Sequence, residues 1–297
     1  MKAGFAAIVG KPNVGKSTLM NALIGEKVSI VSNRPQTTRN KIAGIMNGED
    51  HQVVFLDTPG IHSPKNSLGS YMMKSVRTAV EGVDAIIYVA DAGRELSERD
   101  LDLIRKYIAE GIGVIVAMNK TDEVTAEKIF SELDKLNGVD GISAVVPLSA
   151  LKGSNVEKVR SELLKLIPEG EYFYPRDMIT DKTERFMVAE ILREKALRNL
   201  NEEVPHGIGV EVRKFRERSG AEVVDVDLDL ICEKQSHKGI IIGKQGSMLK
   251  KIVTQARQDM EKLLGVKVFL TVFVKVKEDW RDDNLILRQL GYDKKED

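Results

Sequence analysis

Short apolar runs alternate with amphipathic segments through the first 168 residues of the chain. The apolar runs are FAAIV, AIIYVAD, GVIVAMNK and AVVPLSA, which begin at residues 5, 85, 113 and 144. Between them, segments such as 99–110 and 126–136 carry apolar residues at helical spacing. Runs that are apolar on both faces are typical of parallel strands buried between helix layers. The pattern therefore predicts an α/β domain that has a mostly parallel sheet with flanking helices. Residues 41–47 and 52–57 are expected to form a hairpin beside this sheet.

The pattern changes after residue 168. The segment PEGEYFYPRDMITD has two prolines, a glycine and three aromatic residues without a sustained period, which indicates a packed linker. The elements expected beyond it are a helix at 183–200, strands at 209–215 and 222–233, a glycine loop, a helix at 247–264 and a strand at 266–276. This order predicts an α+β module. We expect domains at 1–168 and 181–297, the second with a C-terminal extension, joined by a linker at 169–180.

Composition narrows the class of protein. Of 297 residues, 42% are hydrophobic and 30% charged, which is typical of a folded globular chain. Lys and Arg number 45, as do Asp and Glu, so any nucleic acid or lipid partner must be held by local charge. Cys232 is the only cysteine, so no intrachain disulfide can form, and we expect it in the core. No apolar stretch approaches the ~20 residues of a spanning helix, and we expect a cytoplasmic protein.

GKPNVGKS, residues 10–17, follows an apolar strand and matches the eight-residue phosphate-binding loop pattern. Glycines let backbone N–H groups turn toward phosphate oxygens, and the helix that follows presents its positive end to the same charge. Lys16 is placed to reach the β- and γ-phosphates, and Ser17 to bind Mg²⁺. The alternative is a chance turn between a strand and a helix.

DTPG, residues 57–60, ends the strand VVFLD. Asp57 can hold Mg²⁺ there, directly or through water, and the Gly60 N–H can meet the γ-phosphate. Taken alone, the motif would be only a turn.

NKTD, residues 119–122, ends the strand GVIVAM. The spacing puts the Asp122 carboxylate where guanine N1–H and the 2-amino group can both donate to it, whereas adenine offers neither donor. In SALKG, which begins at Ser149, a backbone N–H can meet guanine O6. The two motifs predict a guanine nucleotide rather than an adenine nucleotide.

These four ordered motifs resemble the translation-factor-like branch of P-loop GTPases. In this light QTTR, residues 36–39, resembles a first switch segment, with Thr38 expected to bind Mg²⁺ in the GTP state and Thr37 as the alternative. Ile61 stands where Ras-like enzymes have a glutamine that orients the attacking water. We therefore expect slow intrinsic hydrolysis that another group must assist.

Three residues compete to assist hydrolysis. Related GTPases use an asparagine at the position of Asn13 to hold K⁺ near the phosphates. His62 and Arg39 are the rivals, although a histidine in a switch segment is more often simply exposed.

GIIIGKQGSMLKKI, residues 239–252, contains a second glycine loop. It resembles the GXXG loop of a KH domain of type II, in which glycines let a nucleotide backbone approach while helix N–H groups and a lysine meet phosphates. His237, Lys238, Lys244, Lys250 and Lys251 gather around it in the sequence. The alternatives are a turn without a ligand and, for Lys250 and Lys251, a solvated helix face.

A GTPase domain followed by a KH domain resembles the Era-like family of bacterial GTPases over nearly the whole chain. The resemblance implies a factor in 30S ribosomal subunit assembly that hydrolyses GTP and binds 16S rRNA near its 3′ end. It also implies Mg²⁺ as cofactor and peripheral contact with the inner membrane, and nothing in the sequence demands more than a monomer. Two alternatives are a nucleotide-regulated RNA-binding scaffold and a membrane-associated signalling GTPase, in which hydrolysis would be incidental.

The expected site residues fall into four sets. The nucleotide-binding set is Gly10, Asn13, Val14, Gly15, Lys16, Ser17, Thr18, Asn119, Lys120, Asp122, Ser149, Ala150 and Leu151. The catalytic set is Lys16, Thr38 and Gly60, and the metal set is Ser17, Thr38 and Asp57. The RNA-binding set is Gly243, Lys244, Gln245, Gly246 and Lys250.

Overall fold

The structure is a computed structural model that describes residues 1–32, 34, 36–61, 64–218, 220 and 222–292. The chain forms two compact units. The first comprises residues 1–29, 38–63 and 72–181, and the second residues 30–37, 64–71 and 182–297. Each unit builds its own hydrophobic core.

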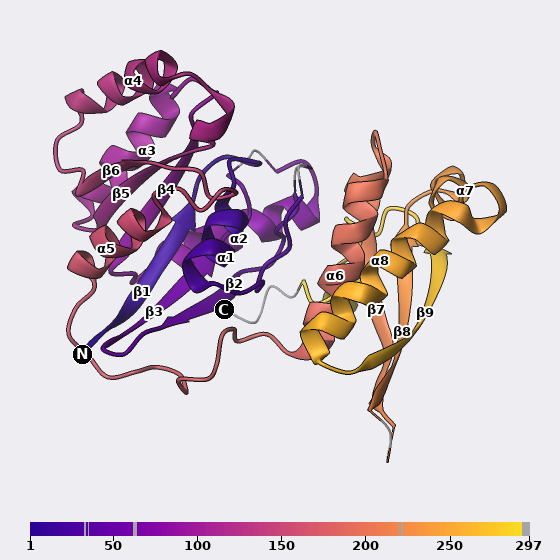
Figure 1. Ribbon diagram of the computed structural model, residues 1–297. Helices are drawn as coiled ribbons and strands as arrows, with labels where there is room; N and C mark the ends of the chain where they lie inside the picture. Colours follow the sequence, from indigo (N-terminus) through magenta and orange to yellow (C-terminus); the bar gives the residue numbers. More distant parts are fainter. Residues whose placement is uncertain (33, 35, 62–63, 219, 221, 293–297) are drawn as a thin grey trace. The chain divides into compact units, whose positions relative to one another are not determined.

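The first unit is built on a six-stranded sheet with the order β2-β3-β1-β4-β5-β6 (Figure 1). Its strands are β1 (Lys2–Val9), β2 (Ile42–Asn47), β3 (His51–Asp57), β4 (Ala85–Asp91), β5 (Gly113–Asn119) and β6 (Ala144–Pro147). Strand β2 runs antiparallel to its neighbour, β3, as the predicted hairpin requires, and the other pairs in this sheet are parallel. The mostly parallel α/β fold expected from the sequence is confirmed.

Helices cover both faces of this sheet (Figure 1). They are α1 (Lys16–Ile24), α2 (Ser67–Val80), α3 (Glu98–Ala109), α4 (Ala126–Asp134) and α5 (Val156–Leu166), with short 3₁₀ turns η1 (Thr121–Glu123) and η2 (Lys135–Gly138). Alternate residues of β1, β4 and β5 pack with Leu101, Ile104 and Tyr107 of α3 in a single buried cluster. Because β1, β3, β4, β5 and β6 are parallel, the loops that follow them emerge at the same edge of the sheet, where every nucleotide motif falls.

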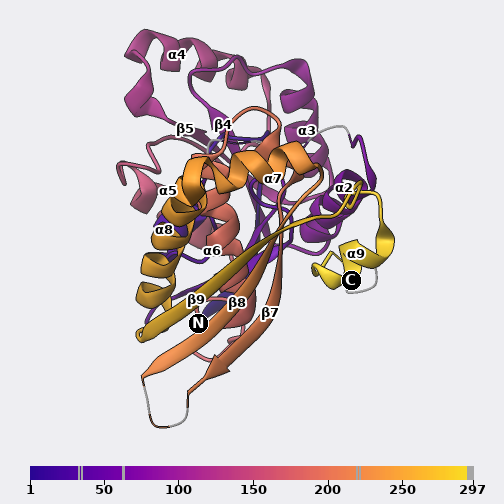
Figure 2. The ribbon, with the colours of Figure 1, turned by 90° about the vertical axis from the view of Figure 1, so that its right-hand side faces the viewer.

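The second unit has a three-stranded sheet with one face covered by helices (Figure 2). Its elements are α6 (Glu184–Asn199), η3 (Val204–Gly207), β7 (Gly209–Glu217), β8 (Val223–Cys232), α7 (Gln235–Ile242), η4 (Lys244–Gly246), α8 (Ser247–Leu264), β9 (Lys267–Val276) and α9 (Asn284–Gln289). Strand β7 is antiparallel to β8, and β9 is parallel to it. Cys232 is fully buried in the core, as expected. The α+β arrangement of a type II KH domain is confirmed.

Helix α7 is absent from the elements expected from the sequence. The pattern marks the run GIII only as an apolar segment before the glycine loop, yet this run forms the end of a helix that begins at Gln235. Ile241 packs into the core and Ile240 is exposed, so only one face of this short helix is buried. Helices α5 and α9 also lie outside the expected set.

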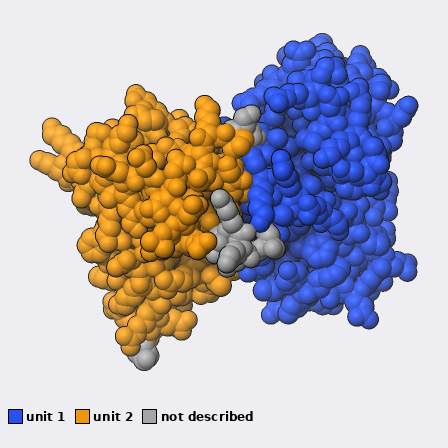
Figure 3. Space-filling view, turned by 180° about the vertical axis from the view of Figure 1, so that it is seen from behind, with its two compact units in different colours: residues 1–29, 38–63, 72–181 blue, residues 30–37, 64–71, 182–297 orange. Residues whose placement is uncertain are grey.

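Two segments from the first part of the chain belong to the second unit (Figure 3). In the first segment, Val31, Gln36 and Thr37 are hydrogen-bonded to α6, and residues 64–71 contain the first turn of α2. The first turn of α2 is held by the C-terminal segment: Ser67 N–H donates to the Asp282 carboxylate at 2.8 Å, and Leu68 N–H to the Arg281 carbonyl at 3.0 Å.

The segment expected as a linker lies along the sheet of the first unit. The Gln52 side chain accepts hydrogen bonds from the N–H groups of Phe173 and Tyr174 and donates one to the Tyr174 carbonyl. The rings of Phe5 and Phe173 lie 4.6 Å apart. Among the described residues, no helix is long and apolar enough to cross a membrane.

Candidate functional site

The loop at residues 10–15 joins β1 to α1 and turns sharply at Gly15. Gly15 has φ 99°, and a Cβ there would lie 2.2 Å from the side-chain nitrogen of Asn119, so only glycine fits. Lys16, the first residue of α1, is almost fully buried and donates to the carbonyls of Gly10 and Lys11 at 3.1 and 2.9 Å. Burial lowers the pKa of Lys16 to about 8, although the charge of Asp57 opposes this shift. A phosphate would supply the anion that this ammonium lacks.

Three hydroxyl groups converge on Asp57 at the end of β3. Ser17 and Ser29 donate to one carboxylate oxygen at 2.7 and 2.8 Å, and Thr38 lies 3.4 Å from the same atom. The hydroxyl oxygens of Ser17 and Thr38 are 2.9 Å apart. Burial raises the pKa of Asp57, against the hydrogen bonds from Ser17 and the charge of Lys16.

The second oxygen of Asp57, Oδ1, is buried and has no hydrogen-bond partner among the described residues. An unpartnered, buried carboxylate oxygen beside two hydroxyl groups is a costly arrangement unless a cation is bound. Hard oxygen ligands suit Mg²⁺, which takes few protein ligands and keeps the rest as water and phosphate oxygens. The residues present therefore fit this ion. Ser29 is not among the expected site residues, because no motif spacing marks it and only the fold brings it to Asp57.

The structure separates the two threonines of QTTR. The Thr37 hydroxyl donates to the Arg34 carbonyl at 2.6 Å, whereas Thr38 points to Ser17. Arg39 is almost fully buried, and His62, its rival for a catalytic role, lies outside the described residues. The Ile61 N–H donates to the Gly10 carbonyl at 3.2 Å, which closes the DTPG turn onto the phosphate-binding loop.

NKTD and SALKG meet the phosphate-binding loop through Asn119. Its side-chain amide donates to the Val14 carbonyl at 2.8 Å and accepts from the Ala150 N–H at 2.9 Å. A hydrogen bond from Ser149 holds the pKa of the exposed Asp122 carboxyl below its usual range. This side chain is therefore an anion, and Ser149, the first residue of SALKG, orients it. Leu151 beside it is 74% exposed, which leaves an apolar surface open at the same place. Together these residues can form a binding site for a planar base that carries two hydrogen-bond donors.

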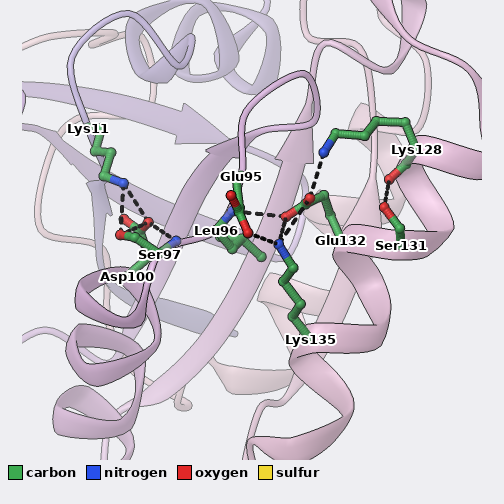
Figure 4. A network of polar contacts seen from close by, with 9 residues as sticks. All are labelled: Lys11, Glu95, Leu96, Ser97, Asp100, Lys128, Ser131, Glu132 and Lys135. Atoms are coloured by element: carbon green, nitrogen blue, oxygen red, sulfur yellow. Dashed lines mark hydrogen bonds and ion pairs between the residues drawn. The ribbon is translucent and has the colours of Figure 1, made fainter.

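A polar network fixes the other side of the phosphate-binding loop (Figure 4). Lys11 donates to Asp100 at 2.6 Å and to Ser97 at 3.1 Å, both at the start of α3. The second Asp100 oxygen accepts the Tyr88 hydroxyl at 2.6 Å. Nearby, Glu132 accepts from the Leu96 N–H and pairs with Lys128 and Lys135. Sequence motifs give no sign of this network, because its members come from separate elements.

The second glycine loop lies between α7 and α8. Gly243 has φ 72°, and a Cβ there would lie 2.7 Å from the Cβ of Met248, so the glycine is required by packing as well as by conformation. Gly246 also has a positive φ, 76°, but a Cβ there would meet no atom of the described residues within 4 Å. The space beside Gly246 is thus open at the N-terminal end of α8, and the positive end of a helix favours an anion.

Exposed lysines flank this loop. Lys244 and Gln245 in the loop and Lys250 on α8 are exposed, as a phosphate-contacting set requires. The sequence groups His237 with these residues, but it is 4% exposed and cannot join the basic surface. Ile240 on α7 is half exposed and supplies an apolar surface next to the loop.

Comparisons with known proteins match the two parts of the chain to two separate family models. The family model described as 50S ribosome-binding GTPase matches residues 5–120, and the KH domain model matches residues 203–281. Proteins named GTPase Era from Clostridium kluyveri and Clostridium perfringens are each 48% identical to this chain. Their alignments cover 98% and 99% of this chain and 99% of each relative.

Two solved structures match over both units. One is a point variant of Aquifex aeolicus Era bound to GDP.AlF4-, and the other is Era in complex with MgGDPNP and nucleotides 1506–1542 of 16S ribosomal RNA. Each is 40% identical with a TM-score of 0.93 and covers 98% of this chain and 99% of its own.

Proposed function

The chain belongs to the Era family of GTPases, and from this premise we propose that it couples its nucleotide state to binding of 16S rRNA near the 3′ end during assembly of the 30S subunit. The proposal rests on the observation that one chain contains two candidate binding sites. Asp57, with its unpartnered oxygen, lies in one, and the open space beside Gly246 in the other.

At the first site the protein binds GTP or GDP together with Mg²⁺. We assign Ser17, Thr38 and Asp57 to the metal, which supplies charge stabilisation to the phosphoryl group in transfer. Lys16 neutralises the β- and γ-phosphates, and the Gly60 N–H meets the γ-phosphate. The assignment of Thr38 rather than Thr37 is supported by its 2.9 Å distance from Ser17. Asp122 selects guanine, and a backbone N–H of SALKG meets O6 of the base.

Intrinsic hydrolysis is slow in this proposal, because Ile61 cannot orient a water through its side chain. Asn13 adopts a left-handed conformation, φ 64°, at the turn of the phosphate-binding loop. We assign it to a K⁺ ion that adds positive charge beside the phosphates. The charge of such an ion would stand in for a second cationic side chain.

At the second site the loop Gly243–Gly246 holds the RNA backbone. The N-terminal end of α8 and Lys244 meet phosphates, and Lys250 adds charge on the next turn of the helix. Bases lie on the apolar surface that includes Ile240. The Era structure with a 16S rRNA fragment bound supports this reading, because that protein matches this chain over both units.

The protein works as a cytoplasmic monomer in this proposal. Peripheral contact with the inner membrane follows from the family resemblance alone. Fractionation of cells into soluble and membrane pools tests it, and an exclusively soluble pool in all nucleotide states would exclude it.

The coupling is tested by RNA affinity in two nucleotide states. A single-stranded RNA with the sequence of the 16S 3′ end is titrated against the protein loaded with GDP or with a non-hydrolysable GTP analogue. We expect the two affinities to differ by about fivefold or more, which is the usual size of such coupling. Equal affinities would leave two independent binding modules in one chain.

A further inference from the structure

Helix α6 of the second unit holds the segment that precedes Thr38. Arg193 donates to the backbone carbonyls of Gln36 and Thr37. The next residue, Glu194, accepts from the Val31 N–H at 3.1 Å, and Arg198, just over one turn further along the helix, donates to the Val31 carbonyl at 2.9 Å. Helix α6 thereby holds this segment near its start, at Val31, and at its end, at Gln36 and Thr37.

The contact at Arg193 is built from buried charge. Arg193 is 1% exposed and forms an ion pair with Glu190, one turn earlier on α6, which is 7% exposed. Burying two charges costs several kcal/mol, and a hydrophobic pair of the same size is often as stable. An apolar pair could therefore hold α6 as well as this ion pair does, but it could not donate to the carbonyls of Gln36 and Thr37. Arg193 suits them because its planar guanidinium can donate to Glu190 and to a carbonyl at once.

The same helix is tied to the helix that follows the glycine loop. Lys195 of α6 pairs with Asp259 of α8, and the Asn199 amide donates to Gln255 of α8 at 2.7 Å. Helix α8 begins at Ser247, directly after Gly246. A shift of α6 along its axis would therefore pull on the helix whose N-terminal end faces RNA.

Thr37 and Thr38 are consecutive, so the carbonyl that Arg193 holds belongs to the peptide bond that leads into the metal-binding threonine. We propose that Arg193 is the positioning residue that transmits the state of Thr38 to α6 and hence to the RNA-binding loop. This inference rests on the proposed function, since it assumes that Thr38 binds Mg²⁺ only with GTP. When Thr38 leaves the metal, the Thr37 carbonyl moves. Arg193 must then move with this carbonyl or lose its hydrogen bond to it.

The test measures the ratio of RNA affinities with the GTP analogue and with GDP, in the full-length protein. Two variants keep α6 folded: Arg193→Lys, which retains the charge but lacks the planar fork, and the double change Glu190→Met/Arg193→Met, which replaces the buried pair by apolar volume. The native ratio of about fivefold or more should fall below about twofold in both. A ratio measured within one variant is not moved by a loss of folded protein.

Arg185→Ala is the matched control, because Arg185 lies on the same helix but donates to the Val212 carbonyl of β7. It should leave the ratio unchanged. A native ratio of one would overturn the proposed function itself. A native ratio above one that persists in both Arg193 variants would overturn only the role of Arg193. Loss of RNA binding in both nucleotide states would also overturn it, because Arg193 would then support the RNA site rather than its control.

Discussion

The hydroxyl oxygens of Ser17 and Thr38 lie 2.9 Å apart although 21 positions separate the two residues in the chain. Both reach the same oxygen of Asp57, whose other oxygen is buried and finds no partner in the part of the chain that the structure describes. The cation site that we propose here would therefore combine residues of the phosphate-binding loop, the first switch segment and the end of β3. The switch segment contributes Thr38 to this site.

Replacing Thr38 should impair the GTP state, and replacing Thr37 should not. Thr38→Ala removes a metal ligand, and we expect at least a tenfold loss in the rate of GTP hydrolysis at saturating GTP, equivalent to about 1.4 kcal/mol. GDP affinity should stay within about twofold, because Thr38 leaves the metal in the GDP state. Thr37→Ala loses only the hydrogen bond to the Arg34 carbonyl. Equal losses in the two variants would contradict the assignment.

Asp122 should decide which base is bound. Asp122→Asn places an N–H donor opposite the 2-amino group of guanine, so two donors face each other, and GTP affinity should fall by about 100-fold or more. Xanthine carries a carbonyl at that position and can accept from the new amide. Fluorescent xanthosine diphosphate should therefore bind measurably to the variant only. Undiminished GTP affinity would show that this carboxylate does not touch the base.

The buried Lys16 should link nucleotide binding to protons. In the nucleotide-free protein the pKa of Lys16 is about 8, below its ordinary 10.5. Between these two pH values Lys16 is more protonated in the unfolded chain than in the folded chain. The contribution of Lys16 to the free energy of unfolding therefore rises with pH in this range. Phosphates restore the charged form, so binding GDP should take up a proton above about pH 8 and affinity should fall as pH rises. Calorimetry at about pH 8.5 in buffers of different ionisation enthalpy measures the uptake. Lys16→Ala should abolish it, and an uptake that persists in that variant belongs to another group.

Asn13 should make hydrolysis depend on the monovalent cation. The native protein is expected to hydrolyse GTP at least about tenfold faster in KCl than in NaCl at equal ionic strength, the effect of one added charge near the phosphates. Asn13→Ala should hydrolyse at the slower rate in both salts. Equal native rates in the two salts would exclude a K⁺ site.

The parts of the site that could be predicted are those fixed by local geometry. Gly15, Lys16 and Ser17 had to lie where a strand passes into a helix, and the order of the elements followed from apolar periodicity. Asp57 and Asn119 could be placed because parallel strands bring their carboxyl ends to one edge of a sheet. The preference for Thr38 over Thr37 rested on the family resemblance alone, since the two residues are adjacent and chemically alike.

Other features depend on contacts between distant segments. Ser29 and Lys11 gain their partners only in the folded chain. Helix α7 escapes prediction because a run of isoleucines between glycines reads as a strand or a helix with equal ease. Nor does the sequence reveal that residues 30–37 belong with α6, because Arg193 and Glu190 look like an ordinary solvated pair until their burial is known.

The most direct test of coupling between the two glycine loops is GTP hydrolysis in KCl with and without single-stranded RNA from the 3′ end of 16S rRNA. Gly246→Asp places a negative charge where phosphate would bind, and Gly265→Asp is its control. Gly265 lies at the opposite end of α8 with φ 70° and equally open space, so the strain and charge are matched. RNA should accelerate hydrolysis in the native protein and in Gly265→Asp, and fail to do so in Gly246→Asp. Acceleration that survives in Gly246→Asp, or that is absent from the native protein, would contradict the account.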